Sequence, residues 1–123
     1  MIDTLNAGAQ MVADAVFGTG ISRAPEGRFA EWIEAMNGSG LPVVAVDVSS
    51  GLDADSGVAY APAVCATTTL TLGLPKAGLT AADGPRLAGE VWVADIGVPF
   101  EAYAALGIEI PPGLFGGSST FKL

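Results

Sequence analysis

The stretch MVADAVFGTGISRAPEGRFAEWIEAMNGSGLPVVAVDV, residues 11–48, decides the fold. Its two ends, residues 11–17 and 41–48, are short apolar runs, which are typical of strands buried in a parallel sheet. Between them, residues 29–36 carry apolar side chains at positions i, i+3, i+4 and i+7, and this spacing predicts an amphipathic helix. Strand, helix and strand in this order predict one βαβ unit with a right-handed crossover.

The rest of the chain extends this unit. Residues 67–72 and 90–96 are predicted to be further strands, and residues 99–106 a short helix, so we expect an α/β fold with a doubly wound, mostly parallel sheet. A parallel sheet needs cover on both faces, and two helices are too few. We therefore expect the domain to be incomplete at its amino terminus, with a missing segment, a partner subunit or a homo-oligomer supplying the rest. Residues 1–110 are predicted to form the domain, and residues 111–123 a loosely ordered tail.

Composition limits the partners and the chemistry. The net charge of −8 argues against a nucleic-acid partner, since binding DNA or RNA relies on Lys and Arg. The chain has no histidine, which excludes Ser/His/Asp and Cys/His nucleophile systems and the common zinc sites. A single cysteine, Cys65, allows no intrachain disulfide and favours a reducing, cytoplasmic compartment. With no apolar leader and no run of 18 apolar residues, we expect neither a signal peptide nor a membrane span.

Each of the two apolar runs contains an aspartate toward its carboxyl end, at the sheet edge where ligands of such folds bind. Asp14 lies inside an apolar run, and a buried carboxylate must be paired, hydrogen-bonded or coordinated to a cation. It is therefore either bonded to nearby backbone N–H groups or a hydroxyl, or it is a cation ligand or the polar anchor of a binding loop. Asp47 either caps the following turn, or contacts ribose hydroxyls or acts as a base. Its apolar neighbours are expected to raise the pKa of Asp47. Lys76 is either a solvated loop lysine or a phosphate contact.

Four segments in a fixed order carry a family resemblance. They are DAVFGTGISRAPEG (14–27), PVVAVDVSSGLDADSG (42–57), TLTLGLPKAGL (69–79) and GEVWVADIGVP (89–99). Together, from about Val12 to Pro99, they resemble the NAD(P)H-hydrate epimerase family, the YjeF amino-terminal domain.

The resemblance implies a Rossmann-like fold in three α/β/α layers. It also implies epimerisation of the R and S forms of hydrated NADH or NADPH, which serves nicotinamide cofactor repair, and a bound potassium ion. The implied site comprises Asp14 and Ser50 as potassium ligands, Gly18, Thr19, Gly20, Ile21, Ser22, Arg23 and Ala24 as the substrate-binding loop, and Asp47 as a substrate contact that moves the proton.

Two departures from the family pattern bear on activity. Ser49 stands where the family's VDIPSG motif has proline, which could loosen the turn. The family's Gly/Asn-rich phosphate loop, of the GNNGGDG kind, lies upstream of the matched region, so the resemblance implies an incomplete site in this chain taken alone. Related bacterial domains are often fused to a dehydratase acting on the same hydrated cofactor, which suggests a functional link to such an enzyme. The alternatives are a non-catalytic nucleotide- or protein-binding module of the same fold, and an inactive truncated product.

Overall fold

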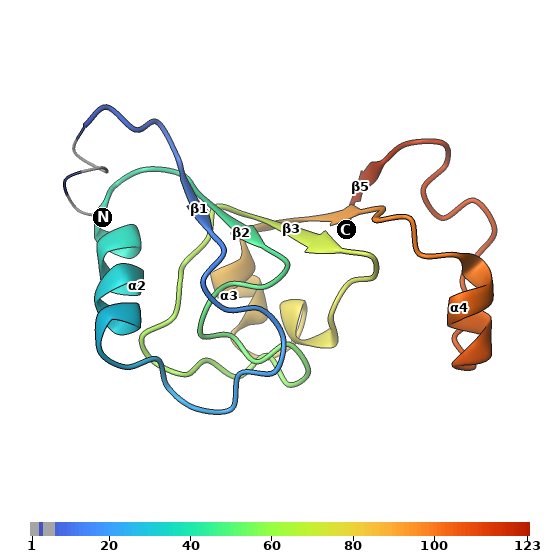
Figure 1. The fold of residues 1–123 in the computed structure, drawn as a ribbon, viewed down its shortest axis with the longest axis horizontal. Helices are drawn as coiled ribbons and strands as arrows, with labels where there is room; N and C mark the ends of the chain where they lie inside the picture. The colour runs from blue at the N-terminus through green and yellow to red at the C-terminus, as the bar shows by residue number, and fades with distance from the viewer. Residues whose placement is uncertain (1–2, 4–6) are drawn as a thin grey trace.

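Five strands form one sheet in the order β1-β2-β3-β4-β5 (Figure 1). The computed structural model describes residue 3 and residues 7–123. The first four strands pair in parallel, and β5 pairs with β4 in the antiparallel sense. The strands are β1 (Val12–Asp14), β2 (Val43–Val46), β3 (Thr68–Leu72), β4 (Glu90–Ala94) and β5 (Thr120–Lys122). The predicted α/β fold with a mostly parallel sheet is confirmed.

The helices lie in the connections between strands. They are α2 (Arg28–Gly38), the single-turn 3-10 helix η1 (Ala77–Leu79), α3 (Gly84–Ala88) and α4 (Phe100–Ala105). Helix α2 forms where the apolar spacing predicts it, and its Ile33 and Met36 are buried. It ends where Ser39 Oγ donates to the Met36 carbonyl and accepts from the Leu41 N–H. The chain then enters β2, which completes the predicted βαβ unit. None of the helices in the described residues is both long enough and apolar enough to span a membrane.

The core lies on one face of the sheet. Val12 pairs with Val43 and Asp14 with Ala45, so these four side chains share a face. Val12, Val43 and Ala45 pack against α2, and on the same face a second cluster joins η1, α3 and Val91 of β4. Figure 1 accordingly shows α2 and α3 on the same side of the sheet. Right-handed crossovers that always advance in one direction place successive connections on one face.

The other face of the sheet is apolar but only partly buried. Its side chains include Val44, Val46, Leu70, Leu72 and Trp92, none of which belongs to a core cluster of the described residues. Val46 is 37% exposed, although it is a β-branched residue in the second strand of the sheet. The second helical layer of the expected three-layer arrangement is therefore not supplied by the residues that the structure describes.

The end of the tail differs from its predicted loose order. Residues Thr120–Lys122 form β5, in which Phe121 pairs with Val93 of β4. The ring centroid of Phe121 lies 5.4 Å from that of Phe115. Lys122 also forms an ion pair with Glu90. The sequence did not indicate this strand because three residues are too few for an alternating pattern to emerge. The boundary at residue 110 stays a prediction.

The connection between β3 and β4 is packed tightly at Gly84. A Cβ added there would lie 2.0 Å from the carbonyl oxygen of Gly78. Gly84→Ala therefore forces the backbone apart, and we expect it to lower the free energy of unfolding by about 2 kcal/mol. Gly38→Ala is the control, since a Cβ in α2 meets nothing within 4 Å and alanine favours helix. Urea unfolding measures both variants, and equal midpoints would contradict the close packing at Gly84.

Candidate functional site

Asp14 ends β1 with its carboxylate completely buried. Its Oδ2 accepts a hydrogen bond from the Ser50 N–H at 2.8 Å, and its Oδ1 accepts from the Ser50 hydroxyl at 2.6 Å and from the Val16 N–H at 3.3 Å. Within the described part of the chain, no cationic side chain pairs with Asp14. Neutral donors therefore bind the buried side-chain oxygens of Asp14, which fits the first of the two interpretations of Asp14 and leaves the second open.

Ser50 joins the loop after β1 to the turn after β2. Its Oγ accepts a hydrogen bond from the Phe17 N–H at 2.8 Å and lies 3.3 Å from the Phe17 carbonyl oxygen. A hydroxyl has only one proton to donate. Asp14 Oδ1, at the shorter distance, is the better acceptor for it than the Phe17 carbonyl oxygen. Asp14 and Ser50, which the resemblance pairs as potassium ligands, are thus in direct contact. Carboxylate, hydroxyl and carbonyl oxygens gathered at one point are the ligand types that suit a hard cation.

The turn after β2 is held firmly. Ser49, at the position of the family's proline, is buried and donates from Oγ to the Leu87 carbonyl at 2.9 Å. At Gly51, φ is +96°, and an added Cβ would lie 2.7 Å from the Cα of Ala63. The expectation that Ser49 loosens this turn is wrong, because its hydroxyl ties the turn to α3.

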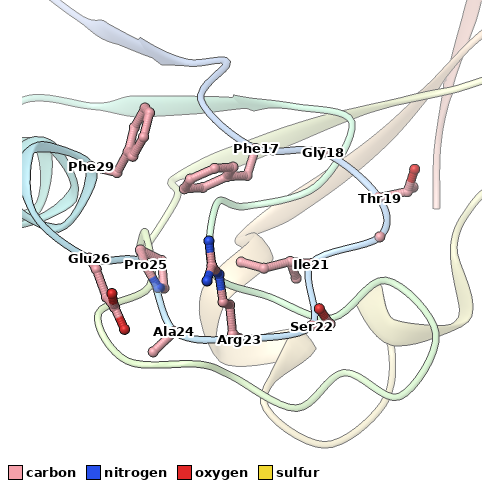
Figure 2. A pocket seen from close by; sticks show the side chains of 11 residues that line it. Phe17, Gly18, Thr19, Ile21, Ser22, Arg23, Ala24, Pro25, Glu26 and Phe29 are labelled. Atoms are coloured by element: carbon pink, nitrogen blue, oxygen red, sulfur yellow. The ribbon is translucent and has the colours of Figure 1, made fainter.

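The loop after β1 lines a cavity of about 470 Å³ (Figure 2). The whole predicted substrate loop, residues 18–24, contributes to the lining. Phe17 and Phe29 form an aromatic wall, with ring centroids 5.1 Å apart. In Figure 2 the side chain of Arg23 extends from the loop in the direction of Phe17, and Arg23 is one of the lining residues. The lining offers an apolar surface, the positive charge of Arg23 and the negative charge of Glu26.

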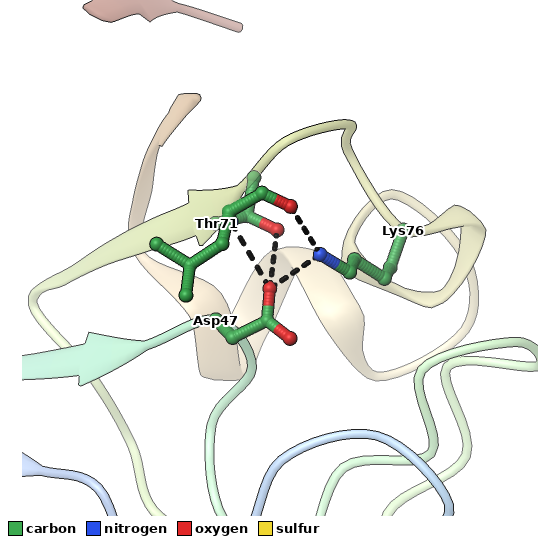
Figure 3. A network of polar contacts seen from close by, with 4 residues as sticks. Asp47, Thr71 and Lys76 are labelled. Atoms are coloured by element: carbon green, nitrogen blue, oxygen red, sulfur yellow. Dashed lines mark hydrogen bonds and ion pairs between the residues drawn. The ribbon is translucent and has the colours of Figure 1, made fainter. Parts of the chain in front are cut away.

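Asp47 follows β2 directly and is not among the residues that line this cavity. Its Oδ1 accepts hydrogen bonds from the Leu72 N–H at 3.0 Å and the Thr71 hydroxyl at 3.2 Å, and it forms an ion pair with Lys76 (Figure 3). The Lys76 ammonium also donates to the Leu72 carbonyl at 2.7 Å. Only 21% of the Lys76 side chain is exposed, so its interpretation as a solvated loop lysine is wrong.

The pKa of Asp47 lies below its ordinary value, which reverses the predicted direction. Burial is the largest single cause and does raise it, as expected. The hydrogen bonds from Lys76, Leu72 and Thr71 and the charge of Lys76 together outweigh burial. The prediction is wrong in its net direction because the sequence does not reveal which donors fold back onto the carboxylate. Asp47 is therefore ionised at neutral pH.

The predicted residues fall into two groups at one edge of the sheet. Asp14 pairs in register with Ala45, two residues before Asp47, so the last residue of β1 and the residue after β2 both lie at the carboxyl edge of adjacent parallel strands. Asp14 and Ser50 contact each other and fix the start of the cavity loop, whereas Asp47 contacts β3 and Lys76. Sequence reasoning missed Thr71 as a polar contact. Its hydroxyl falls at the end of a strand in alternation with Leu70 and Leu72, and that spacing is the only signal for it.

Comparison with known families gives a match over most of the chain. The family model described as YjeF-related protein N-terminus matches residues 2–78. The NAD(P)H-hydrate epimerase of Dehalogenimonas lykanthroporepellens is 43% identical over 101 residues, which cover 82% of this chain and 40% of that protein. The bifunctional NAD(P)H-hydrate repair enzyme Nnr of Moorella thermoacetica is 46% identical over 91 residues, 74% of this chain and 17% of that enzyme. The chain thus spans less than half the length of these relatives.

A solved structure shows the same fold. The crystal structure of the yeast protein YNL200c matches with a TM-score of 0.76 at 22% identity, and the match covers 99% of this chain and 50% of that one. At this identity the likeness concerns the fold alone.

Proposed function

Because the chain belongs to the family of YjeF-related protein N-termini, we propose that it acts in NAD(P)H-hydrate epimerisation, interconverting the R and S forms of hydrated NADH or NADPH. The observation that carries this proposal is the joining of the cavity loop to the carboxyl edge of the sheet. The contact of Ser50 with Asp14 and Phe17 fixes where the loop at residues 18–24 begins. A ligand in the cavity therefore has a defined position relative to that edge.

The residues supply binding and proton transfer. Phe17 and Phe29 offer an apolar surface to a ring, and Arg23 offers a charge to a phosphate. Epimerisation breaks and re-forms a bond at the hydrated carbon, and a proton must leave and return as it does so. The Asp47 carboxylate, ionised at neutral pH, is the group we assign to accept and return that proton.

We propose that a potassium ion binds at the cluster around Asp14. We assign Asp14 and Ser50 to hold it, because their oxygens meet at a buried point where neutral groups alone balance the carboxylate. When bound, the ion would supply positive charge beside the binding loop. We expect the bound ion to order the loop and to raise the affinity for the nucleotide.

Binding without turnover is a second candidate function. The lowered pKa of Asp47 favours it, since a more acidic carboxyl is a weaker base. In this role Asp47 would accept hydrogen bonds from ribose hydroxyls and the cavity would hold the same nucleotide. Nucleotide binding with no acceleration of epimerisation would distinguish this function from catalysis.

The cellular setting is proposed on the same basis. The Moorella relative carries the name of a bifunctional repair enzyme, and we propose that this chain works alongside a dehydratase that consumes one epimer of the hydrated cofactor. The exposed free thiol of Cys65 supports a reducing, cytoplasmic compartment. The apolar open face of the sheet supports association with further chain, either a second copy or an amino-terminal segment.

The proposal is tested by following the approach of one purified epimer of hydrated NADH to the R/S mixture. We expect the rate to rise in proportion to the concentration of the chain, and to be higher in potassium than in lithium chloride. A rate equal to the spontaneous one would contradict the proposed activity.

Arg23 offers a direct test of nucleotide binding in the cavity. Arg23→Gln removes the positive charge that lies among the lining residues, and we expect it to weaken the binding of hydrated NADPH about tenfold, the cost of one charged hydrogen bond. Arg28→Gln is the matched control, because Arg28 is exposed at the start of α2 and does not line the cavity. Isothermal titration calorimetry measures the affinity of both variants for hydrated NADPH. Equal affinities of Arg23→Gln and Arg28→Gln would show that the phosphate does not bind beside Arg23.

A further inference from the structure

We propose that Lys76 is a positioning residue that clamps Oδ1 of Asp47 against the end of β3, so that Oδ2 is the oxygen presented to the nucleotide. This proposal rests on the proposed role of Asp47. It assigns a task to a lysine to which the family resemblance gives none. The clamp is visible in Figure 3, where Lys76 and Thr71 converge on one oxygen of the carboxylate.

The hydrogen bonds of Asp47 are concentrated on one oxygen. Oδ1 accepts from the Leu72 N–H, the Thr71 hydroxyl and the Lys76 ammonium. Oδ2 accepts none from any residue that the structure describes. The side chain is 19% exposed, and in Figure 3 its second oxygen is directed away from the contacts that Oδ1 makes. One oxygen of the carboxylate is thus used for anchoring and the other is left for chemistry.

The backbone segment that follows Lys76 is closely packed. Lys76 directly precedes η1, where Leu79 is buried and the Gly78 N–H donates to the Ala54 carbonyl at 2.7 Å. A Cβ at Gly78 would lie 2.3 Å from the carbonyl oxygen of Asp53, so the backbone two residues after Lys76 is packed closely against the segment at residues 53–54. The ammonium is also bonded to the Leu72 carbonyl, which fixes its direction.

The backbone of Asp47 is held in an uncommon conformation. Its φ of +72° lies in the left-handed region, which aspartate enters more readily than most residues but at a cost. The Asp47 N–H donates to the Leu70 carbonyl at 2.9 Å, so backbone and side chain are both tied to β3. Such conformations persist where surrounding contacts enforce them, and they gather at functional sites.

A purely structural ion pair is the competing explanation. The pair is largely buried, so Lys76→Met should lower the free energy of unfolding under either explanation, and stability does not separate the two. Both explanations predict a higher pKa of Asp47 once Lys76 is lost, but only the positioning role predicts that proton transfer at Asp47 is impaired. Lys76 is the charged group that contacts Asp47 among the described residues. Its loss should therefore raise the pKa of Asp47 and free the carboxylate to rotate.

The experiment compares Lys76→Met and Lys76→Arg with the wild-type chain. Lys122→Met is the matched control, because it removes a lysine ion pair elsewhere, with Glu90. Carbon-13 NMR titration of the Asp47 carboxyl should show a higher pKa in Lys76→Met, a value returned toward wild type in Lys76→Arg, and no change in Lys122→Met. The same Asp47 pKa in Lys76→Met as in wild type would overturn the proposal.

Kinetics give the second readout. In the epimerisation assay, Lys76→Met should lower kcat about tenfold or more, with a smaller change in KM, because a misdirected carboxylate impairs proton transfer more than binding. The acidic limb of the pH–rate profile of Lys76→Met should lie at higher pH than that of the wild-type chain. An Asp47 of raised pKa becomes protonated at a higher pH on acidification. Unchanged kcat and an unmoved limb would overturn the proposal. If the wild-type chain shows no turnover, the proposed function fails, while the NMR titration still decides whether Lys76 contacts Asp47 in solution.

Discussion

Asp14→Ala is expected to lower the free energy of unfolding by about 4 kcal/mol, the combined effect of losing the acceptor for several buried donors and leaving a small cavity. The Ser50 N–H and hydroxyl and the Val16 N–H all donate to this carboxylate. Loss of the buried charge also removes its own desolvation cost, which keeps the effect from being larger.

Urea unfolding followed by circular dichroism measures this loss. Asp55→Ala is the matched control, since Asp55 is exposed and its carboxylate accepts no hydrogen bond from a described residue, so its midpoint should stay within error of wild type. If Asp14→Ala unfolds at the same urea concentration as Asp55→Ala, the Asp14–Ser50 contact does not hold the site together.

Asp47→Asn should reduce the rate of epimerisation by about 10²–10⁴-fold, the usual contribution of a positioned acid or base. The amide preserves the shape and can still accept the hydrogen bonds at one oxygen, so the chain should fold and affinity for hydrated NADH should fall much less than the rate. An amide does not take up a proton at neutral pH, and the loss should therefore appear in kcat.

Asp53→Asn provides the comparison for that variant. Asp53 lies in the next turn and also accepts hydrogen bonds, from the Ser56 N–H and hydroxyl. Its replacement should leave kcat unchanged. An Asp47→Asn chain as active as Asp53→Asn would show that the proton passes through another group, and it would favour Asp47 as a ribose contact.

Local sequence patterns predict much of this fold. The apolar spacing in residues 29–36 indicates a helix with one face buried against the sheet, and helix α2 forms over Arg28–Gly38. The apolar runs on either side become β1 and β2, because a continuous apolar segment suits a strand in a parallel sheet. The strand ends then place Asp14 and Asp47 at the same edge without further information.

The details of the site depend on contacts between distant segments, which a single sequence does not display. Lys76 reaches Asp47 across 29 positions, and that distance turns an apparent loop lysine into an ion-pair partner. Ser49 bonds to the carbonyl of Leu87, 38 positions away. Both contacts reversed expectations drawn from local context, one about solvation and pKa and the other about the rigidity of the turn.

The central claim is that the nucleotide binds at the carboxyl edge of the sheet, between the loop at residues 18–24 and the turn at 47–50. Amide chemical-shift mapping of the isotope-labelled chain during titration with hydrated NADH tests it most directly. The account predicts that the largest shifts fall in those two segments. A second cavity is lined by residues of α4 and by residues 107–113. Shifts confined to that cavity, or none at saturating nucleotide, would contradict the account.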